Sequence, residues 1–321
     1  MTQINANYDE PWKEALTEYF DSFIQFFFPS IYEQIDWSKT PISLDKELQQ
    51  ITAISGAKKR IADKLYQVWL LNQQTLWILI HVEVQSQYDA KFPERMYIYN
   101  YRAFDLYRRP VISLAVLGDD RANWRPNSYT YGLEGAKVKL DFLTVKLLDY
   151  GNNWEELENN LNPFAVVTMA HLKTQNTTQN LVEREEYKWQ LIRGLYERGL
   201  GKVQIIKLFQ IIDKMMTLPT NLQQKLSSKI KQIEEEKSMP FLSTMEEMAL
   251  ERGKEIGKQV EALENIKTVL NTRFGSTNNT EIETNLNTIS DLTLLKEILK
   301  QAVVANSLRE FQEFLDNMIQ N

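Results

Sequence analysis

The chain has 321 residues, of which 43% are hydrophobic and 25% are charged, a balance typical of a soluble globular protein with two or three domains. The absence of cysteine excludes a disulfide framework, a thiolate metal site and a cysteine nucleophile, and two histidines leave little room for a histidine-rich zinc site. The net charge of −6 argues against a protein that coats nucleic acid non-specifically.

The first predicted elements are a helix and a pair of strands. Large apolar residues recur at intervals of three or four, the period of a buried helix face, until Pro29: Trp12, Leu16, Phe20, Phe23 and Phe27. Residues 63–71 and 75–85 are rich in Val, Ile, Trp and Leu, and only three polar residues separate them. This pattern predicts an antiparallel hairpin.

A second helix and two more strands are predicted before residue 150. Apolar residues recur at helical spacing between residues 90 and 109, and Pro110 ends the pattern. The continuous apolar run at 111–117 predicts a strand buried on both faces, and the alternation at 138–145 predicts one further strand. The order of helix, hairpin, helix and strand indicates an α/β fold.

The second half of the chain has the periodicity of helices. Asn162-Pro163 begins one helix, a Ser243-x-x-Glu246 capping box begins another, and three more are predicted at 181–198, 203–216 and 222–236. After a polar break at 275–281, short amphipathic helices follow at 285–318. The sequence therefore predicts a core at 1–150, a helical region at 151–274 and a small C-terminal helical module at 275–321.

Targeting signals are not recognisable in the sequence. The N-terminus has no basic segment followed by an apolar one, and no later stretch approaches about 18 uninterrupted apolar residues. We therefore expect a cytoplasmic protein with no membrane partner.

Acidic residues stand at both ends of the predicted hairpin. If its turn centres on Gln73, Asp63 faces Glu83 directly, and Gln85 lies on the same face of the sheet. Two opposed carboxylates repel each other unless one is protonated or a cation lies between them. A shift of one residue in register would place them on opposite faces, and both also fit solvated strand ends beside Lys64.

A divalent metal ion would resolve this repulsion. With no cysteine and little histidine, oxygen ligands favour Mg²⁺ or Mn²⁺ over zinc. Such an ion activates water and neutralises charge in phosphodiester hydrolysis. The acid pair thus indicates a candidate site for this chemistry.

Cations are concentrated in the same part of the chain. Residues 1–52 hold 3 Lys/Arg and 9 Asp/Glu, whereas residues 53–125 hold 11 and 7. Arg95, Arg102 and Arg109 are seven residues apart and form a basic stripe on the second predicted helix. The stripe fits a phosphate backbone and a solvated helix face equally well.

The motifs together resemble a known nuclease superfamily. Asp63 after Ala62, then Glu83-Val84-Gln85 on the next strand, then a helix with RMYIYNYR at 95–102 and a buried strand, are similar to the PD-(D/E)XK nucleases. The closer resemblance is to the recombination-promoting nuclease and transposase-like family, which has an α-β-β-β-α-β core. The later helices resemble the helical half of these proteins, and the last ~60 residues resemble a small domain of unknown function in cyanobacterial members.

This resemblance implies a restriction-endonuclease-like fold and a Mg²⁺-dependent endonuclease acting on DNA. Asp63 and Glu83 would ligate the metal, with Glu47 as an additional ligand. Gln85 would position the attacking water where the superfamily more often has lysine, although an amide cannot act as a base. Arg95 or Arg102 would engage a phosphate.

Several alternatives stay open at this point. Without the lysine, the chain also fits an inactive nucleic-acid-binding protein, and its helical half fits an oligomeric assembly protein. His81 lies on the predicted site face, where a lone histidine is more often structural, and the tyrosines of 97–107 fit helix packing as well as base stacking. For a nuclease with one site per chain, double-strand cutting is simplest in a homodimer.

Overall fold

A computed structural model describes residues 8–45, 64–71, 77–237, 260–275 and 292–320, together with Lys258, Ile282 and Leu286. Contacts divide the chain into two compact units, Met1–Ile233 and Glu234–Asn321. The three-part division expected from the sequence stays a prediction. No helix in the described part of the chain is long and apolar enough to cross a membrane.

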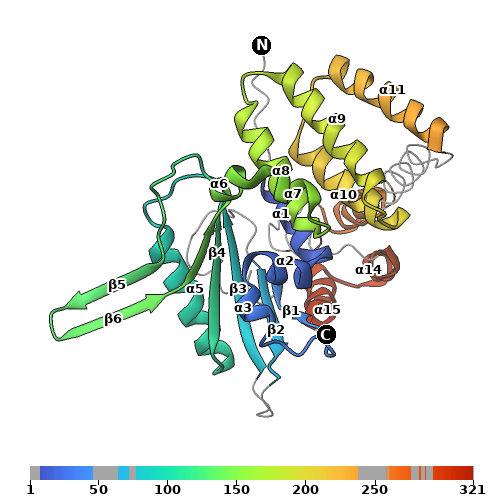
Figure 1. The fold of residues 1–321 in the computed structure, drawn as a ribbon. Coiled ribbons are helices and arrows are strands. Elements are labelled where there is room, and N and C mark those ends of the chain that lie inside the picture. The colour runs from blue at the N-terminus through green and yellow to red at the C-terminus, as the bar shows by residue number, and fades with distance from the viewer. Residues whose placement is uncertain are drawn as a thin grey trace. The chain divides into compact units, whose positions relative to one another are not determined.

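The first unit is built on a mixed five-stranded sheet in the order β1-β2-β3-β4-β7 (Figure 1). The strands are β1 (Ile42–Ser43), β2 (Lys64–Trp69), β3 (Trp77–Gln85), β4 (Val111–Leu117) and β7 (Leu143–Lys146). The first three are antiparallel, whereas β4 is parallel to β3 and to β7. This mixed α/β architecture confirms the predicted α/β class and places β3 at the centre, whereas the restriction-endonuclease-like core stays a prediction.

The hairpin has the register that the sequence predicts. Lys64 pairs with Val82 and Trp69 with Trp77, so the ladder is the one expected for a turn centred on Gln73. Asp63, which precedes β2, lies outside the described residues. The predicted strands at 63–71 and 75–85 are therefore confirmed, with bounds within two residues.

Helix α5 (Phe92–Tyr107) connects β3 to the parallel strand β4 and covers one face of the sheet. Phe92 and Met96 pack against Ala115 and Leu117, and the interior of this cluster is fully buried. Asn100 Nδ2 donates hydrogen bonds to the backbone of β4 and to Ser113 Oγ, 3.0 Å each. The predicted helix at 90–109 and the buried strand at 111–117 are both confirmed.

The other face of the sheet is covered by the N-terminal helices. The single helix expected before Pro29 is two helices, α1 (Asp9–Glu18) and α2 (Phe20–Phe27), and a short α3 (Pro29–Tyr32) follows. The break at Tyr19, with φ −137° and ψ 42°, has no glycine or proline to announce it. It lets Phe20 stack on Tyr66 of β2 at 3.8 Å between ring centroids.

The strand expected at 138–145 is in fact two strands in different sheets. β6 (Ala136–Asp141) pairs with β5 (Ser128–Leu133) in a separate two-stranded ribbon, and β7 joins the main sheet. Phe142, between β6 and β7, is buried against α5 and turns the chain from one sheet into the other. The ribbon extends away from the main sheet and is mostly exposed (Figure 1).

Helices form the rest of the first unit, and the boundary between the two units falls within the last of them. They are α6 (Leu147–Tyr150), a 3₁₀ turn (Gly151–Asn153), α7 (Trp154–Asn159), α8 (Pro163–Asn176), α9 (Leu181–Glu197), α10 (Lys202–Met215) and α11 (Thr220–Lys237). Asn162 caps α8 by accepting a hydrogen bond from Phe164 N at 2.9 Å. The predicted helices of this region are confirmed within two residues.

The second unit has its own apolar core. Residues 260–274 are helical, and α14 (Leu292–Val304) and α15 (Leu308–Gln320) follow. Leu270, Ile298 and Phe311 are buried in one cluster. The predicted C-terminal helices are confirmed, whereas the capping box at Ser243 lies outside the described residues.

Candidate functional site

A row of polar side chains lies on the α5 face of the central strand. His81, Glu83 and Gln85 alternate with apolar residues along β3, so all three point towards α5. Their exposed fractions are 0%, 0% and 3%. Such burial of a carboxylate and an amide in the middle of a sheet is costly unless partners are provided.

Arg95 on the first turn of α5 is the principal partner. Its Nε donates to Glu83 Oε1 at 2.6 Å, its Nη2 to Gln85 Oε1 at 2.7 Å and its Nη1 to Asp89 Oδ2 at 2.5 Å. We call these four residues, Glu83, Gln85, Asp89 and Arg95, the acid site. One guanidinium therefore donates hydrogen bonds to two carboxylates and one amide.

The amide of Gln85 is fixed at both ends. Its oxygen accepts from Arg95, and its Nε2 donates to the backbone oxygen of Gln87. The amide orientation follows from this network, since the two partners have opposite hydrogen-bonding character. In this arrangement Gln85 is held in place by protein groups.

Glu83 has one oxygen that the acid site does not use. Its Oε2 has no hydrogen-bond partner among the described residues and lies 3.9 Å from His81 Nε2. Burial raises the pKa of the Glu83 carboxyl above its ordinary value, and the Arg95 guanidinium offsets only part of this rise.

His81 is a neutral imidazole at physiological pH. Burial, reinforced by the charge of Arg95, lowers its pKa to about 3. The ring packs edge-on against Tyr99 of α5, with centroids 5.4 Å apart.

Three of the residues predicted from the sequence come together in the described part of the chain. Glu83, Gln85 and Arg95 are in direct contact. Arg102, seven residues along α5, contacts the Tyr101 hydroxyl through Nε at 3.4 Å. Asp63 and Glu47, the remaining expected metal ligands, lie outside the described residues.

Asp89 is the member of the acid site that the sequence did not reveal. It lies in the loop before α5, and its Oδ1 accepts from Lys91 N at 2.9 Å. A short polar side chain just before a helix is typical of such a turn. This position was the available signal, although it does not distinguish a turn residue from a site residue.

A buried ion pair lies at the same edge of the sheet. Gln85, Leu117 and Lys146 are aligned across the three parallel strands. Lys146 pairs with Asp119, and both side chains are 1% exposed. The sequence gave no reason to connect these two residues, which are far apart along the chain.

Tyrosines line the outer side of α5 and the ribbon, where Tyr101 and Tyr131 are exposed and Tyr97 and Tyr129 are partly buried. Tyr97 lies within 5.2–5.5 Å, between ring centroids, of Tyr101, Tyr129 and Tyr131. The Tyr97 and Tyr131 hydroxyls are 3.0 Å apart, and this hydrogen bond raises the pKa of Tyr97 to about 12. Tyr99, in contrast, is buried, so the tyrosines of this helix divide between packing and surface.

The donor atoms at the acid site fit a divalent cation only in part. Among the described residues, no three His, Cys, Asp or Glu side chains are grouped so as to hold a metal ion. Two buried donors without partners in that part of the chain, Glu83 Oε2 and His81 Nε2, do face one another. They supply one carboxylate oxygen and one imidazole nitrogen.

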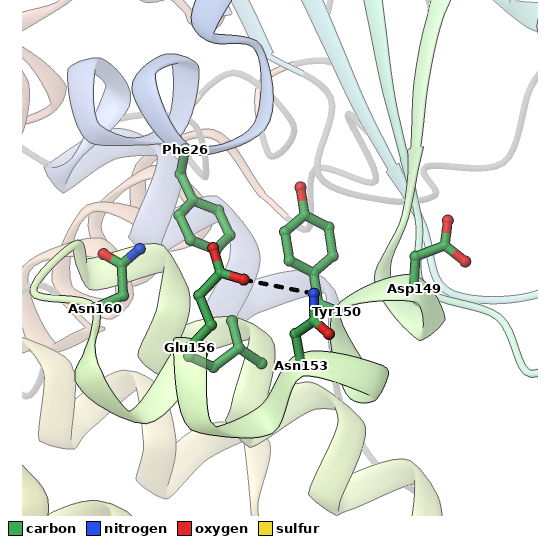
Figure 2. A pocket seen from close by; sticks show the side chains of 7 residues that line it. Phe26, Asp149, Tyr150, Asn153, Glu156 and Asn160 are labelled. Carbon is green, nitrogen blue, oxygen red and sulfur yellow. Dashed lines mark hydrogen bonds between the residues drawn. The ribbon is translucent and has the colours of Figure 1, made fainter.

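One cavity of the first unit contains none of these residues. It has a volume of about 200 Å³ and lies among α2, α6 and α7 (Figure 2). Its polar lining includes Glu156, which accepts from Asn153 Nδ2 at 3.5 Å, and Asp149, which pairs with Arg125 at 2.6 Å. Phe26 stacks on Tyr150 along its wall, and Asp149, Asn153 and Glu156 are exposed, so we interpret it as a shallow surface recess between helices.

The comparisons with known proteins identify no relative. No protein-family model matches the chain, and no curated protein and no solved structure is significantly similar to it.

Proposed function

We propose that this chain is a metal-dependent endonuclease that hydrolyses phosphodiester bonds in DNA. The observation that carries the proposal is Glu83, a carboxylate with 0% exposure on the central strand whose Oε2 has no partner among the described residues. Leaving a buried acceptor unpaired costs about 1–3 kcal/mol. Buried polar groups that lack a hydrogen-bond partner weaken the fold, and such departures are found mainly at functional sites.

The order of elements is consistent with a restriction-endonuclease-like core. Helices come first, three antiparallel strands follow, and α5 then crosses to the parallel strand β4. This is the α-β-β-β-α-β order of the nuclease family that the sequence resembles. It supports the proposal together with the motif residues, since fold alone does not define function.

In the proposed site, Asp63 and Glu83 hold Mg²⁺ or Mn²⁺, with Glu47 as a further ligand. A bound ion would supply a Lewis acid for the phosphate and lower the pKa of water. Arg95 keeps Glu83 Oε1 and Gln85 Oε1 in one orientation. Gln85 would position the water, and Arg95 or Arg102 would engage a phosphate of the DNA.

The test is cleavage of supercoiled plasmid by the purified protein with Mg²⁺, Mn²⁺ or EDTA. We expect metal-dependent nicking that Glu83→Gln and Asp63→Asn abolish. The matched control is Glu94→Gln, because Glu94 is an exposed carboxylate on the same turn of α5 as Arg95. This variant should cleave like the parent protein. Nicking that persists in Glu83→Gln would refute the site assignment.

One observation favours a second candidate, a DNA-binding protein that does not cleave. Arg95 already engages Glu83, Gln85 and Asp89, so a cation of the protein itself occupies the acid site. In the same assays this candidate predicts retarded plasmid on a gel and no nicking with either metal. A two-fold dimer remains the simplest assembly for cutting both strands, and sedimentation with and without DNA would detect it.

A further inference from the structure

The two histidines of the chain are both buried, yet their environments differ. His171 has both ring nitrogens in hydrogen bonds, with Trp12 Nε1 at 3.1 Å and with Gly118 O at 2.8 Å. His81 has neither nitrogen paired within the described residues. Buried polar side chains are paired in the large majority of cases, so an unpaired imidazole needs an explanation.

We propose that His81 Nε2 and Glu83 Oε2 are ligands of one divalent cation, and that this nitrogen ligand makes the site prefer Mn²⁺ to Mg²⁺. The proposal deepens the proposed function and rests on it for the requirement of a metal. Histidine was the least expected residue of this row, because a lone histidine on a strand is commonly structural.

The separation of the two atoms fits a shared ion. His81 Nε2 and Glu83 Oε2 are 3.9 Å apart, which is too long for a direct hydrogen bond. In zinc sites, bonds from histidine nitrogen and carboxylate oxygen to the ion are each about 2.0–2.2 Å, which gives the scale for a shared divalent ion. Two such bonds span the observed gap, and the ion would satisfy both unpaired atoms at once.

Local charge favours a cation over a buried water in that gap. Among the described contacts of the acid site, two carboxylates, Glu83 and Asp89, share the single guanidinium of Arg95. The Glu83 side chain is 0% exposed, and its Oε2 has no hydrogen-bond partner among the described residues. A neutral water could bridge the two atoms, but only a cation would also attract the charge of the ionised Glu83 carboxylate.

The ligand set determines the preference among metals. Mg²⁺ prefers oxygen ligands and keeps several waters, whereas imidazole suits transition metals, and Mn²⁺ also accepts carboxylates. A site with Glu83 and the neutral imidazole of His81 therefore favours Mn²⁺. This differs from the oxygen-only site that the residue counts suggested.

Pulsed electron paramagnetic resonance of Mn²⁺ bound to the full-length protein tests the assignment directly. Because the chain has only His81 and His171, a histidine-nitrogen coupling to Mn²⁺ has two possible origins. We expect that coupling in the parent protein, with the spectrum changing when histidine is labelled with ¹⁵N. It should vanish in His81→Gln and persist in His171→Gln, and thermal unfolding would verify that both variants fold.

Metal titrations provide a second readout that does not depend on cleavage. Loss of an outer partner of a metal ligand already costs about 10- to 100-fold in affinity, so His81→Gln should weaken Mn²⁺ binding by at least about tenfold. Mg²⁺ binding should change less. If His81→Gln does not fold, ¹⁵N labelling of the parent protein still shows whether a histidine nitrogen binds Mn²⁺, and His171→Gln shows whether that histidine is His81.

The outcomes separate this proposal from the proposed function. Mn²⁺ bound without nitrogen coupling would refute the role of His81 and leave the nuclease proposal intact. Equal affinities for Mn²⁺ and Mg²⁺ would refute the preference. Absence of any Mn²⁺ binding to the parent protein would overturn the His81 proposal, and the nuclease proposal would fall with it only if cleavage with Mg²⁺ were absent too. Nitrogen coupling without plasmid cleavage would support His81 and count against the nuclease.

Discussion

Trp12 and Gly118 hold the imidazole of His171 in one tautomer. The indole Nε1–H donates to Nδ1, so the remaining ring proton is on Nε2 and is donated to Gly118 O. Burial lowers the pKa of His171 to about 4 from an ordinary value of 6.5. A proton added at Nδ1 would point at the indole N–H, which adds to the cost of charging the ring.

We predict an acid-sensitive contribution to stability from this residue. Because its pKa is lower in the folded than in the unfolded chain, the contribution is complete above pH 6.5 and is lost as the pH falls towards 4. Between pH 7 and 5 the loss should be about 2 kcal/mol. Urea unfolding at both pH values measures it, with His171→Gln as the comparison. An unchanged pH dependence in this variant would contradict the prediction.

At the level of single residues, strand alternation predicted much of the candidate site. Glu83 and Gln85 share a face because they are two residues apart, and the hairpin register followed from the position of its polar break. Asp89 and the unpaired state of His81 were not predictable, because both depend on where α5 packs. Tertiary packing of this kind leaves no periodic trace in the sequence.

At the level of elements, α9 is held by two buried cations. Arg184 and Lys188 are 0% exposed and donate to groups at the ends of neighbouring helices. Arg184 Nη2 donates to Thr174 O at 2.9 Å and its Nε to Thr177 Oγ1 at 3.1 Å. Lys188 Nζ donates to Asp213 Oδ1 at 2.7 Å and to Met216 O at 3.0 Å. These cations satisfy carbonyls that the helix ends leave open.

Arg184→Met should therefore be strongly destabilising. The change removes the hydrogen bonds that a buried charged donor makes to Thr174 O and Thr177 Oγ1, at about 1.5–3 kcal/mol each, so we expect a loss of about 3 kcal/mol in the free energy of unfolding. Arg193→Met, on the exposed side of the same helix, should change it by less than about 0.5 kcal/mol. Chemical denaturation of both variants makes the comparison, and equal losses would show that burial of Arg184 is not the cause.

Most elements were predictable because they follow a strict period. The helices α9 to α11 and the strand β4 were found within two residues of their bounds, and the start of α8 was found as well. The β5–β6 ribbon was missed as a unit, because the alternation at 138–145 joined part of β6 to β7 as one strand, and the largely exposed β5 has no apolar run to indicate it. Gly135, with φ +85° in the tight turn between Leu133 and Ala136, was the usable signal.

At the level of the whole molecule, the two units offer separate optical signals. All seven tryptophans precede residue 234, so their fluorescence reports on the first unit alone. The second unit has its own core, in which Phe311 is 0% exposed. Far-ultraviolet circular dichroism reports on the helices of both units.

Phe311→Ala should therefore destabilise the second unit and leave the first unchanged. Removing this buried ring creates a cavity that costs about 3–5 kcal/mol, which is large for a core of this size. We expect part of the circular dichroism transition to move to lower temperature, while the midpoint of tryptophan fluorescence stays unchanged. A fluorescence midpoint that moves by the same amount would mean that the two units unfold as one.

The described residues of the acid site, together with His81, all fall between positions 81 and 95, within the β3–α5–β4 segment from Trp77 to Leu117. A constellation carried by one uninterrupted stretch of chain is inherited as a single block of coding sequence. Exchange of gene fragments between ancestors could then transfer the whole arrangement in one event, whereas sites assembled from distant segments need several compatible changes. The surrounding helices could diverge freely while this short block kept its geometry, which is one route by which sequence similarity fades before architecture does.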